Sequence, residues 1–258
     1  MSEAVTITAA IAPARAQALL ASLGRPQRVK SGDVLPPLAH FAYFWEPVDE
    51  AQTGRDGHAR PGGLIPNLGL PIRMWAGGRL TFHAPFRAGF AAQKVTTLHE
   101  VKERQGRSGR LGLDTLKHEI RQRHAPVISE MQDIVYREPG PLAGDPPVET
   151  GKAHVRHALK LQELTLFRYS AITFNGHRIH YDANYCREEG YPGLVVHGPF
   201  LATRLACLAA EHLGTLKSFS CRATAPLFLG DAAWLCRAGD KYWVEGPNSR
   251  RCMAATAT

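Results

Sequence analysis

The chain has 258 residues, of which 44% are hydrophobic and 21% charged, a composition typical of globular proteins. This length suits one large domain or two small ones with a sizeable core. No apolar run approaches the roughly 20 residues that span a bilayer. No signal peptide opens the chain, so neither membrane spanning nor export is expected.

The charge is +8, from 31 Lys and Arg against 23 Asp and Glu, which favours an anionic partner. The sequence has no motif of the kind that reads a nucleic-acid groove, so nucleic acid is disfavoured as that partner. The remaining candidate for the anionic partner is a phosphorylated small ligand. The cysteines are odd in number and never spaced as CxxC, which is typical of reduced structural thiols. A cytoplasmic location follows, and the arginines of residues 1–30 leave an organelle matrix open.

The first half begins with a short helix predicted between Pro13 and Gly24, from apolar residues at helical spacing. A long Pro- and Gly-rich loop follows over 46–71, and long loops are often functional. Three extended stretches predict an antiparallel meander at 93–102, 110–121 and 127–137, with GRSG at 106–109 as a turn.

Four prolines and three glycines between 138 and 151 predict a linker. We therefore divide the chain into an N-terminal domain, a linker and a C-terminal domain, at 1–140, 141–151 and 152–258.

The second half contains the strongest helix pattern, from Pro199 to Leu213. It is apolar nearly all round, which indicates a buried helix. Further strands are predicted at 217–225, 232–238, 242–245 and 251–258.

The halves share the pattern A-P-x-x-x-G-x-A-A at 84–92 and 225–233. This indicates an internal duplication, with a chance repeat of a Pro-to-Gly turn as the alternative. The first copy has only LGLPIRMWAGG, at 68–78, where the second has its helix. We therefore expect a reduced helix there, leaving room for an elongated ligand.

Polar and titratable side chains are densest in the segment 173–182. His180 is the candidate acid/base, because imidazole exchanges protons near neutrality; an ordinary surface histidine is the alternative. His177 and His180 form H-x-x-H, as do His154 and His157, but no further ligand is suitably spaced, so no metal site is predicted.

Gly198 opens the buried helix within His197-Gly198-Pro199. Free N–H groups at a helix N-terminus suit an oxygen that becomes negative during reaction. Pro199 has no N–H, so Gly198 is the candidate donor; an ordinary turn into a helix is the alternative.

The segments FNGHRIHYD and GYPGLVVHGP resemble the MaoC-like hydratases and dehydratases of the hot-dog superfamily. Their form is similar to a two-domain subgroup that includes mesaconyl-C4-CoA and itaconyl-CoA hydratases and mitochondrial-type 3-hydroxyacyl-thioester dehydratases. DGH at 56–58 and RMWAGG at 73–78 also resemble that subgroup. The resemblance implies an α+β double hot-dog fold: two antiparallel sheets side by side, a long central helix buried in the C-terminal half, and an acyl-CoA between them.

Asn175 stands where the broader group has a catalytic aspartate. An amide can orient water but cannot take its proton, so the resemblance implies that His180 is the principal acid/base. Asp182 is a further catalytic candidate that orients His180 or replaces the missing carboxylate.

Arg178 replaces a proline of the motif and could bind a substrate carboxylate; an ion pair with Asp182 or a CoA phosphate contact are the alternatives. The remaining candidates for substrate binding are His177, Tyr181, His197 and Arg222.

The resemblance implies a hydro-lyase that adds water to an enoyl-CoA, with a branched dicarboxylyl-CoA as first choice. The alternatives are a 3-hydroxyacyl-thioester dehydratase of fatty acid synthesis, a hot-dog thioesterase and a non-catalytic acyl-CoA-binding protein. No cofactor is expected beyond the CoA of the substrate. The expected partner is that acyl-CoA, and neither nucleic acid nor a membrane is expected to bind. The protein itself is expected to be a monomer or a homodimer.

Overall fold

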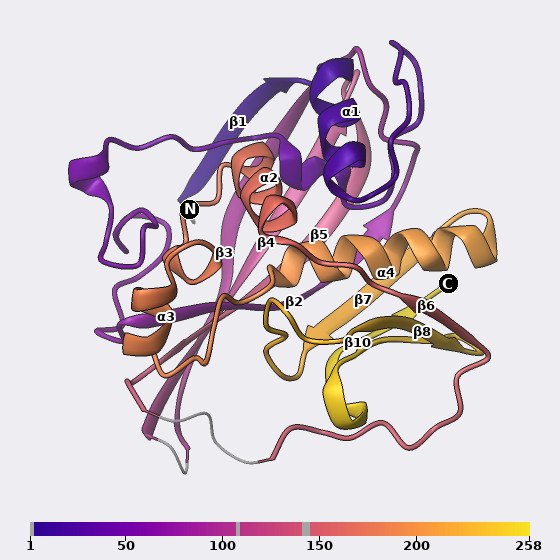
Figure 1. The fold of residues 1–258 in the computed structure, drawn as a ribbon. Helices are drawn as coiled ribbons and strands as arrows, with labels where there is room; N and C mark the ends of the chain where they lie inside the picture. The colour runs from indigo at the N-terminus through magenta and orange to yellow at the C-terminus, as the bar shows by residue number, and fades with distance from the viewer. Residues whose placement is uncertain (1–2, 107–108, 141–144) are drawn as a thin grey trace.

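Two similar sets of elements follow one another along the chain in a computed structural model that describes residues 3–106, 109–140 and 145–258 (Figure 1). The first half contains β1 (Ala4–Ala10), α1 (Pro13–Ser22), η1 (Ala39–Ala42), η2 (Glu50–Gln52), β2 (Ile72–Phe82), β3 (Ala91–Gly106), β4 (Gly109–Gln122) and β5 (Ala125–Arg137). The second contains β6 (Val155–Ala158), α2 (Glu163–Thr173), η3 (Arg178–His180), α3 (Ala183–Glu188), α4 (Gly198–Leu213), β7 (Ser218–Ala223), β8 (Trp234–Ala238), β9 (Lys241–Glu245), η4 (Pro247–Ser249) and β10 (Arg251–Ala257). The predicted first helix, the strands of both meanders and the buried helix are confirmed, whereas residues 107 and 108 of the predicted GRSG turn lie outside the described residues.

Within the described residues, the strands form one ten-stranded sheet in the order β1-β3-β4-β5-β2-β7-β10-β9-β8-β6. Each half contributes five strands, and the order within one half mirrors that within the other. The expected two sheets are therefore joined edge to edge, through antiparallel pairing of β2 with β7. Gly77 on β2 permits this junction, since a Cβ there would lie 2.2 Å from the carbonyl oxygen of Cys221.

Helix α4 packs against the sheet of the second half and touches β7, β8, β9 and β10 as well as β2 (Figure 1). Nine of its sixteen residues are buried, because apolar side chains occupy most of its circumference. Pro199 lies in its first turn, and Gly214 follows its end with φ of 78°. No helix in the described residues is long and apolar enough to cross a membrane.

The repeated pattern marks the same turn in both halves. Leu35 N–H donates to the carbonyl of Phe86 at 2.8 Å, and Val196 N–H donates to that of Leu227 at 2.8 Å. The next element along the chain is η1 in the first half and α4 in the second. The prediction that 68–78 holds the reduced helix is therefore wrong: most of it is β2, and the reduced helix is η1.

The apolar part of the 46–71 loop packs on the sheet of the first half. Leu64, Ile65 and Leu68 pack against a cluster that includes Leu116 and Ile134. Of the predicted linker, 141–144 lie outside the described residues, and Val148 bridges to Arg250. The three-part division of the chain stays a prediction.

Candidate active site

A cavity of about 1220 Å³ is lined by residues of both halves. Its polar lining includes several sequence-predicted residues, namely Asn175, His177, His180, Gly198 and Arg222. It also includes residues to which no role was assigned from the sequence, among them His58, Arg73 and Trp75. Because strands of both halves contribute, the completed site depends on the β2–β7 junction.

His180 lies in η3 and is 6% exposed. A carbonyl oxygen can only accept, so the 2.7 Å contact with Val195 fixes the proton on Nδ1 and leaves Nε2 as the free nitrogen. Burial lowers the pKa of His180 to about 4, although the bond to Val195 opposes this. The imidazole is therefore neutral near pH 7 and can act as a base.

His197 supports His180 from outside the cavity lining. Their rings are stacked with centroids 3.5 Å apart, and Nε2 of His197 lies 2.8 Å from the Ser170 hydroxyl. His197 is 1% exposed, and burial lowers its pKa. The predicted substrate contact of His197 is thus not what the structure shows; its ring packs behind that of His180.

Asn175 uses its side-chain carbonyl within its own turn, where it accepts from the N–H of His177 at 2.9 Å. Phe174 before it has a left-handed backbone, with φ of 53°, that ends α2. The amide Nδ2 of Asn175 is consequently the group left to bind a ligand or water, and it can only donate.

The structure corrects the interpretation of Asp182. Its Oδ1 caps α3 by accepting from Asn184 and Tyr185, both at 3.0 Å, and its Oδ2 pairs with Arg178 at 2.6 Å. His180 is oriented by a backbone carbonyl, so the expected role of Asp182 toward it is wrong. A side chain can replace the missing carboxylate only if it reaches the cavity, and Asp182 is absent from the lining.

Arg178 forms the ion pair that the sequence left as an alternative, and it also donates to the carbonyl of Arg55 at 3.3 Å. It does not line the cavity. Tyr181 is 56% exposed and donates its hydroxyl to the carbonyl of Gly176 at 3.1 Å. Both residues hold loops together instead of contacting the space where a substrate would lie.

Gly198 and Arg222 do line the cavity. Gly198 is the first residue of α4, and a Cβ there would lie 2.7 Å from Cε3 of Trp75, so only glycine fits without displacing that ring. In the described chain no hydrogen bond occupies its N–H, which leaves a donor at the positive end of the helix.

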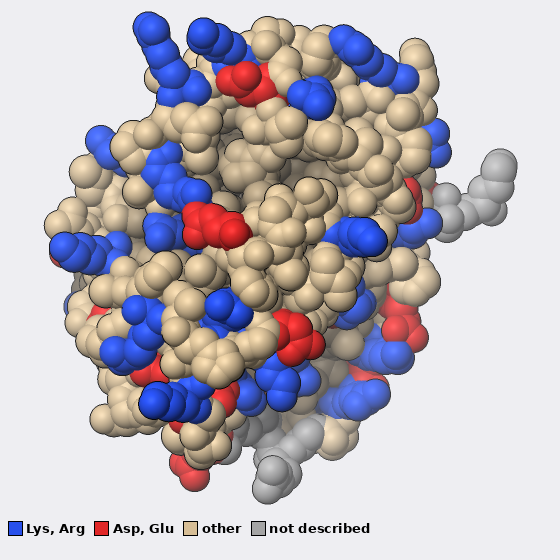
Figure 2. Space-filling view, turned by 90° about the vertical axis from the view of Figure 1, so that its right-hand side faces the viewer, with Lys and Arg blue, Asp and Glu red and all other residues tan. Residues whose placement is uncertain are grey.

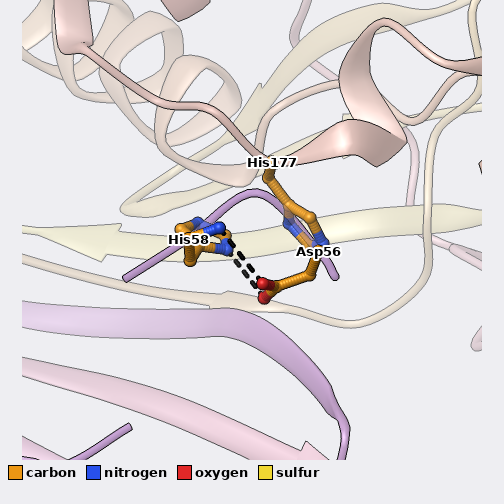
Figure 3. A group of neighbouring side chains, drawn as sticks. All are labelled: Asp56, His58 and His177. Carbon is orange, nitrogen blue, oxygen red and sulfur yellow. Dashed lines mark hydrogen bonds and ion pairs between the residues drawn. The ribbon is translucent and has the colours of Figure 1, made fainter. Parts of the chain in front are cut away.

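The 46–71 loop places the imidazole of His58 in the cavity lining and holds the carboxylate of Asp56 against that imidazole (Figure 3). His58 Nδ1 lies 3.0 Å from Asp56 Oδ2, and the ring centroids of His58 and His177 lie 4.5 Å apart. Burial would raise the pKa of Asp56, but the hydrogen bond and charge of His58 and the charge of Arg73 lower it to about 2. Burial lowers the pKa of His58 and takes that of His177 to about 2.

Asp56, His58 and His177 also form the one potential metal-ligating group found in the described residues, with ligand atoms within 4.8 Å of one another. Asp56 and His58 each already use one of these atoms in their mutual hydrogen bond. The sequence pointed to this loop through its length and through the resemblance of DGH at 56–58, but neither signal assigned chemistry to Asp56 or His58.

The family model of hydroxyacyl-thioester dehydratase type 2 matches residues 38–229, about three quarters of the chain. The chain belongs to this family. It is also 42% identical to the mesaconyl-C4-CoA hydratase of Chloroflexus aurantiacus, over 94% of this chain and 90% of that protein. This member of the dehydratase family is therefore a hydratase or dehydratase enzyme.

Solved structures show the fold of this family member. HtdX of Mycobacterium tuberculosis superposes with a TM-score of 0.71 at 18% identity and covers 99% of both chains. A second protein of that organism, described as a double hot-dog fold, has a TM-score of 0.59 at 15% identity and covers 99% of this chain and 94% of its own. The double hot-dog prediction is confirmed.

Proposed function

We propose that the enzyme adds water reversibly to the double bond of a branched dicarboxylyl-CoA, with mesaconyl-C4-CoA as the first candidate and citramalyl-CoA as its product. Itaconyl-CoA is the second candidate of this class. The 42% identity to a mesaconyl-C4-CoA hydratase over most of both chains carries the proposal. Arg73 supports it, because this arginine lines the cavity and forms no ion pair with the described residues.

In the proposed reaction, Nδ2 of Asn175 and Nε2 of His180 hold the attacking water. His180 takes a proton as the water oxygen bonds to the β-carbon of the enoyl thioester. Negative charge then reaches the thioester oxygen, where the N–H of Gly198 stabilises it, and return of a proton to the α-carbon completes the hydroxyacyl-CoA. Loss of one such donor typically slows turnover about 10²- to 10³-fold.

Arg73 is the candidate receptor for the substrate carboxylate, in place of Arg178. It lies on β2, is partly buried, and lines the cavity near Asp56, His58 and His177. It has no carboxylate partner among the described residues, whereas Arg79 is paired with Asp133. In mesaconyl-C4-CoA the carboxylate is attached to the β-carbon, so its receptor belongs beside the group that activates water.

The CoA part of the substrate would meet further cations of the cavity lining, including Arg104 and Arg222. Figure 2 shows Lys and Arg side chains scattered over one face of the molecule instead of gathered in one patch. Such a surface with net charge +8 favours approach of a polyanionic thioester. Both hot-dog halves lie in one chain, so a monomer contains a complete pair, and we propose a monomer or homodimer.

The test is the loss of enoyl-thioester absorbance with mesaconyl-, itaconyl- and crotonyl-CoA, for the wild type, His180→Ala and Arg73→Gln. We expect hydration of a dicarboxylyl-CoA by the wild type and almost none by His180→Ala. Arg73→Gln should lower kcat/KM at least tenfold more on the dicarboxylyl substrate than on crotonyl-CoA.

Equal losses on all substrates would contradict the role of Arg73 and favour the 3-hydroxyacyl-thioester dehydratase alternative. Free CoA without a hydroxyacyl product would identify a thioesterase, and binding without turnover would identify an acyl-CoA-binding protein.

A further inference from the structure

His58 offers a second imidazole to the cavity that His180 lines, and the two come from different halves of the chain. Nδ1 of His58 donates to Oδ2 of Asp56 at 3.0 Å. The other carboxylate oxygen, Oδ1, accepts from the backbone N–H of His58 at 3.1 Å. Both contacts fix the ring and its tautomer, so Nε2 of His58 is the nitrogen left for a ligand.

Close backbone contact holds this pair against the 175–182 segment. A Cβ on Gly57 would lie 2.1 Å from the carbonyl oxygen of Gly176, and a Cβ on Gly176 would lie 2.7 Å from that of Gly57. The N–H of Arg178 donates to the carbonyl of Asp56 at 2.9 Å. The loop is thus fixed to the catalytic segment, as a precisely positioned group requires.

A carboxylate that accepts from Nδ1 stabilises the imidazolium formed when Nε2 takes a proton. His180 has a neutral carbonyl oxygen in the corresponding place, which raises its pKa but supplies no full negative charge to the imidazolium. Asn175 cannot supply it either, because an amide is neutral. Of the cavity's histidines in the described residues, His58 alone is hydrogen-bonded to a carboxylate.

We propose that His58 is a second catalytic acid/base of the hydration reaction proposed above, and that Asp56 is its positioning residue. The water oxygen bonds to the β-carbon, and His180 takes one water proton. That proton passes to His58 through His177, whose ring centroid lies 4.5 Å from that of His58 and 5.5 Å from that of His180. Nε2 of His58 then delivers it to the α-carbon of the enolate, and no proton is gained or lost.

Dehydration runs in reverse, so neutral His58 removes the α-proton. If His58 removes this proton and Asp56 acts through His58, replacing Asp56 should change the isotope effect, which a purely structural role of Asp56 would not do. If Asp56→Asn weakens His58 as a base, α-proton removal becomes slower relative to the other steps, and the α-deuterium isotope effect on kcat rises.

The experiment compares full-length wild type, His58→Gln, Asp56→Asn, Asp56→Glu and His157→Gln. His157 is exposed on β6 and serves as the matched histidine control. We expect kcat to fall about 10²-fold or more in His58→Gln, with KM within about threefold. In Asp56→Asn, kcat should fall about 10-fold or more and the α-deuterium isotope effect on kcat should be larger than in the wild type. Asp56→Glu should recover part of the rate that Asp56→Asn loses. The control His157→Gln should have the kcat of the wild type.

Unchanged kcat in His58→Gln would overturn the inference, as would a loss in Asp56→Asn without a larger isotope effect. Thermal melting identifies a variant that fails to fold, and the near-isosteric Asp56→Asn then carries the test. The two proposals fail separately: a wild type that hydrates no enoyl-CoA refutes the proposed function, whereas an active wild type with an equally active His58→Gln refutes only the role of His58.

Discussion

Four histidines around the catalytic segment are kept neutral by burial. The pKa values of His58, His177, His180 and His197 are all lowered, and burial is the largest cause at each. Only a neutral imidazole can accept a proton from water. Burial therefore weakens these bases but keeps them in the form that the reaction uses over a wide range of pH.

The first prediction concerns the pH dependence of rate. The acid limb of kcat/KM for hydration should have its midpoint below 6.5, the ordinary pKa of histidine, and toward the value of about 4 for His180. Initial rates in overlapping buffers from pH 4 to 8 measure it. A midpoint at or above 6.5 would show that a group other than these buried histidines limits the rate.

The second prediction concerns Gly198. Alanine there would press on Trp75, so Gly198→Ala should move the ring or the helix end and lower kcat about 10-fold or more. Gly193→Ala is the control, because a Cβ on Gly193 would meet no atom within 4 Å and its φ is not positive. Similar rates in both variants would show that the N–H of Gly198 is not used.

Among the elements, β2 connects the two halves and also supplies Arg73 and Trp75 to the cavity. Gly77 allows close approach to β7, and antiparallel pairing with both β5 and β7 makes this segment a strand although it has little apolar alternation. The sequence pattern identified α4, which is apolar nearly all round, and both meanders, whose extended stretches are separated by turn residues. It did not identify β2, because pairing with strands of both halves decides that conformation.

The third prediction compares two glycines with similar backbone angles. Gly77 and Gly62 have φ of 153° and 151°, but only Gly77 faces a neighbouring strand closely. Both alanine variants incur backbone strain of about 1 to 3 kcal/mol. Gly77→Ala should lose more stability than Gly62→Ala, because its Cβ also meets Cys221. Urea unfolding measures both, and equal losses would contradict a tight β2–β7 junction.

For the whole molecule, the buried histidines link stability to pH. Their folded-state pKa values lie below the 6.5 of the unfolded chain, so below pH 6.5 the unfolded chain binds more protons and is favoured. Their contribution to stability is present above pH 6.5 and is lost as pH falls toward the folded values. For His180, whose pKa falls from 6.5 to about 4, the loss reaches roughly 3 kcal/mol.

The fourth prediction follows from this linkage. The free energy of unfolding should decrease as pH falls from 7 to 5, and the decrease should be smaller in His180→Gln, which removes one such group. Urea denaturation at pH 7, 6 and 5 tests both statements. A wild type whose stability is constant or increases over this range would contradict the neutral state of these residues.

The buried helix could be predicted from its apolar residues, and the double hot-dog fold and the segment of Asn175 and His180 from the resemblance of a local motif to a known family. Apolar periodicity and a local motif are properties of neighbouring residues, so one sequence is enough to read them. The structure was needed to select the ion pair with Asp182 from the alternatives for Arg178, and to show that Arg73 and His58, the latter held by Asp56, reach the cavity. These contacts join segments far apart in the chain or depend on where a side chain points, and no local pattern encodes either.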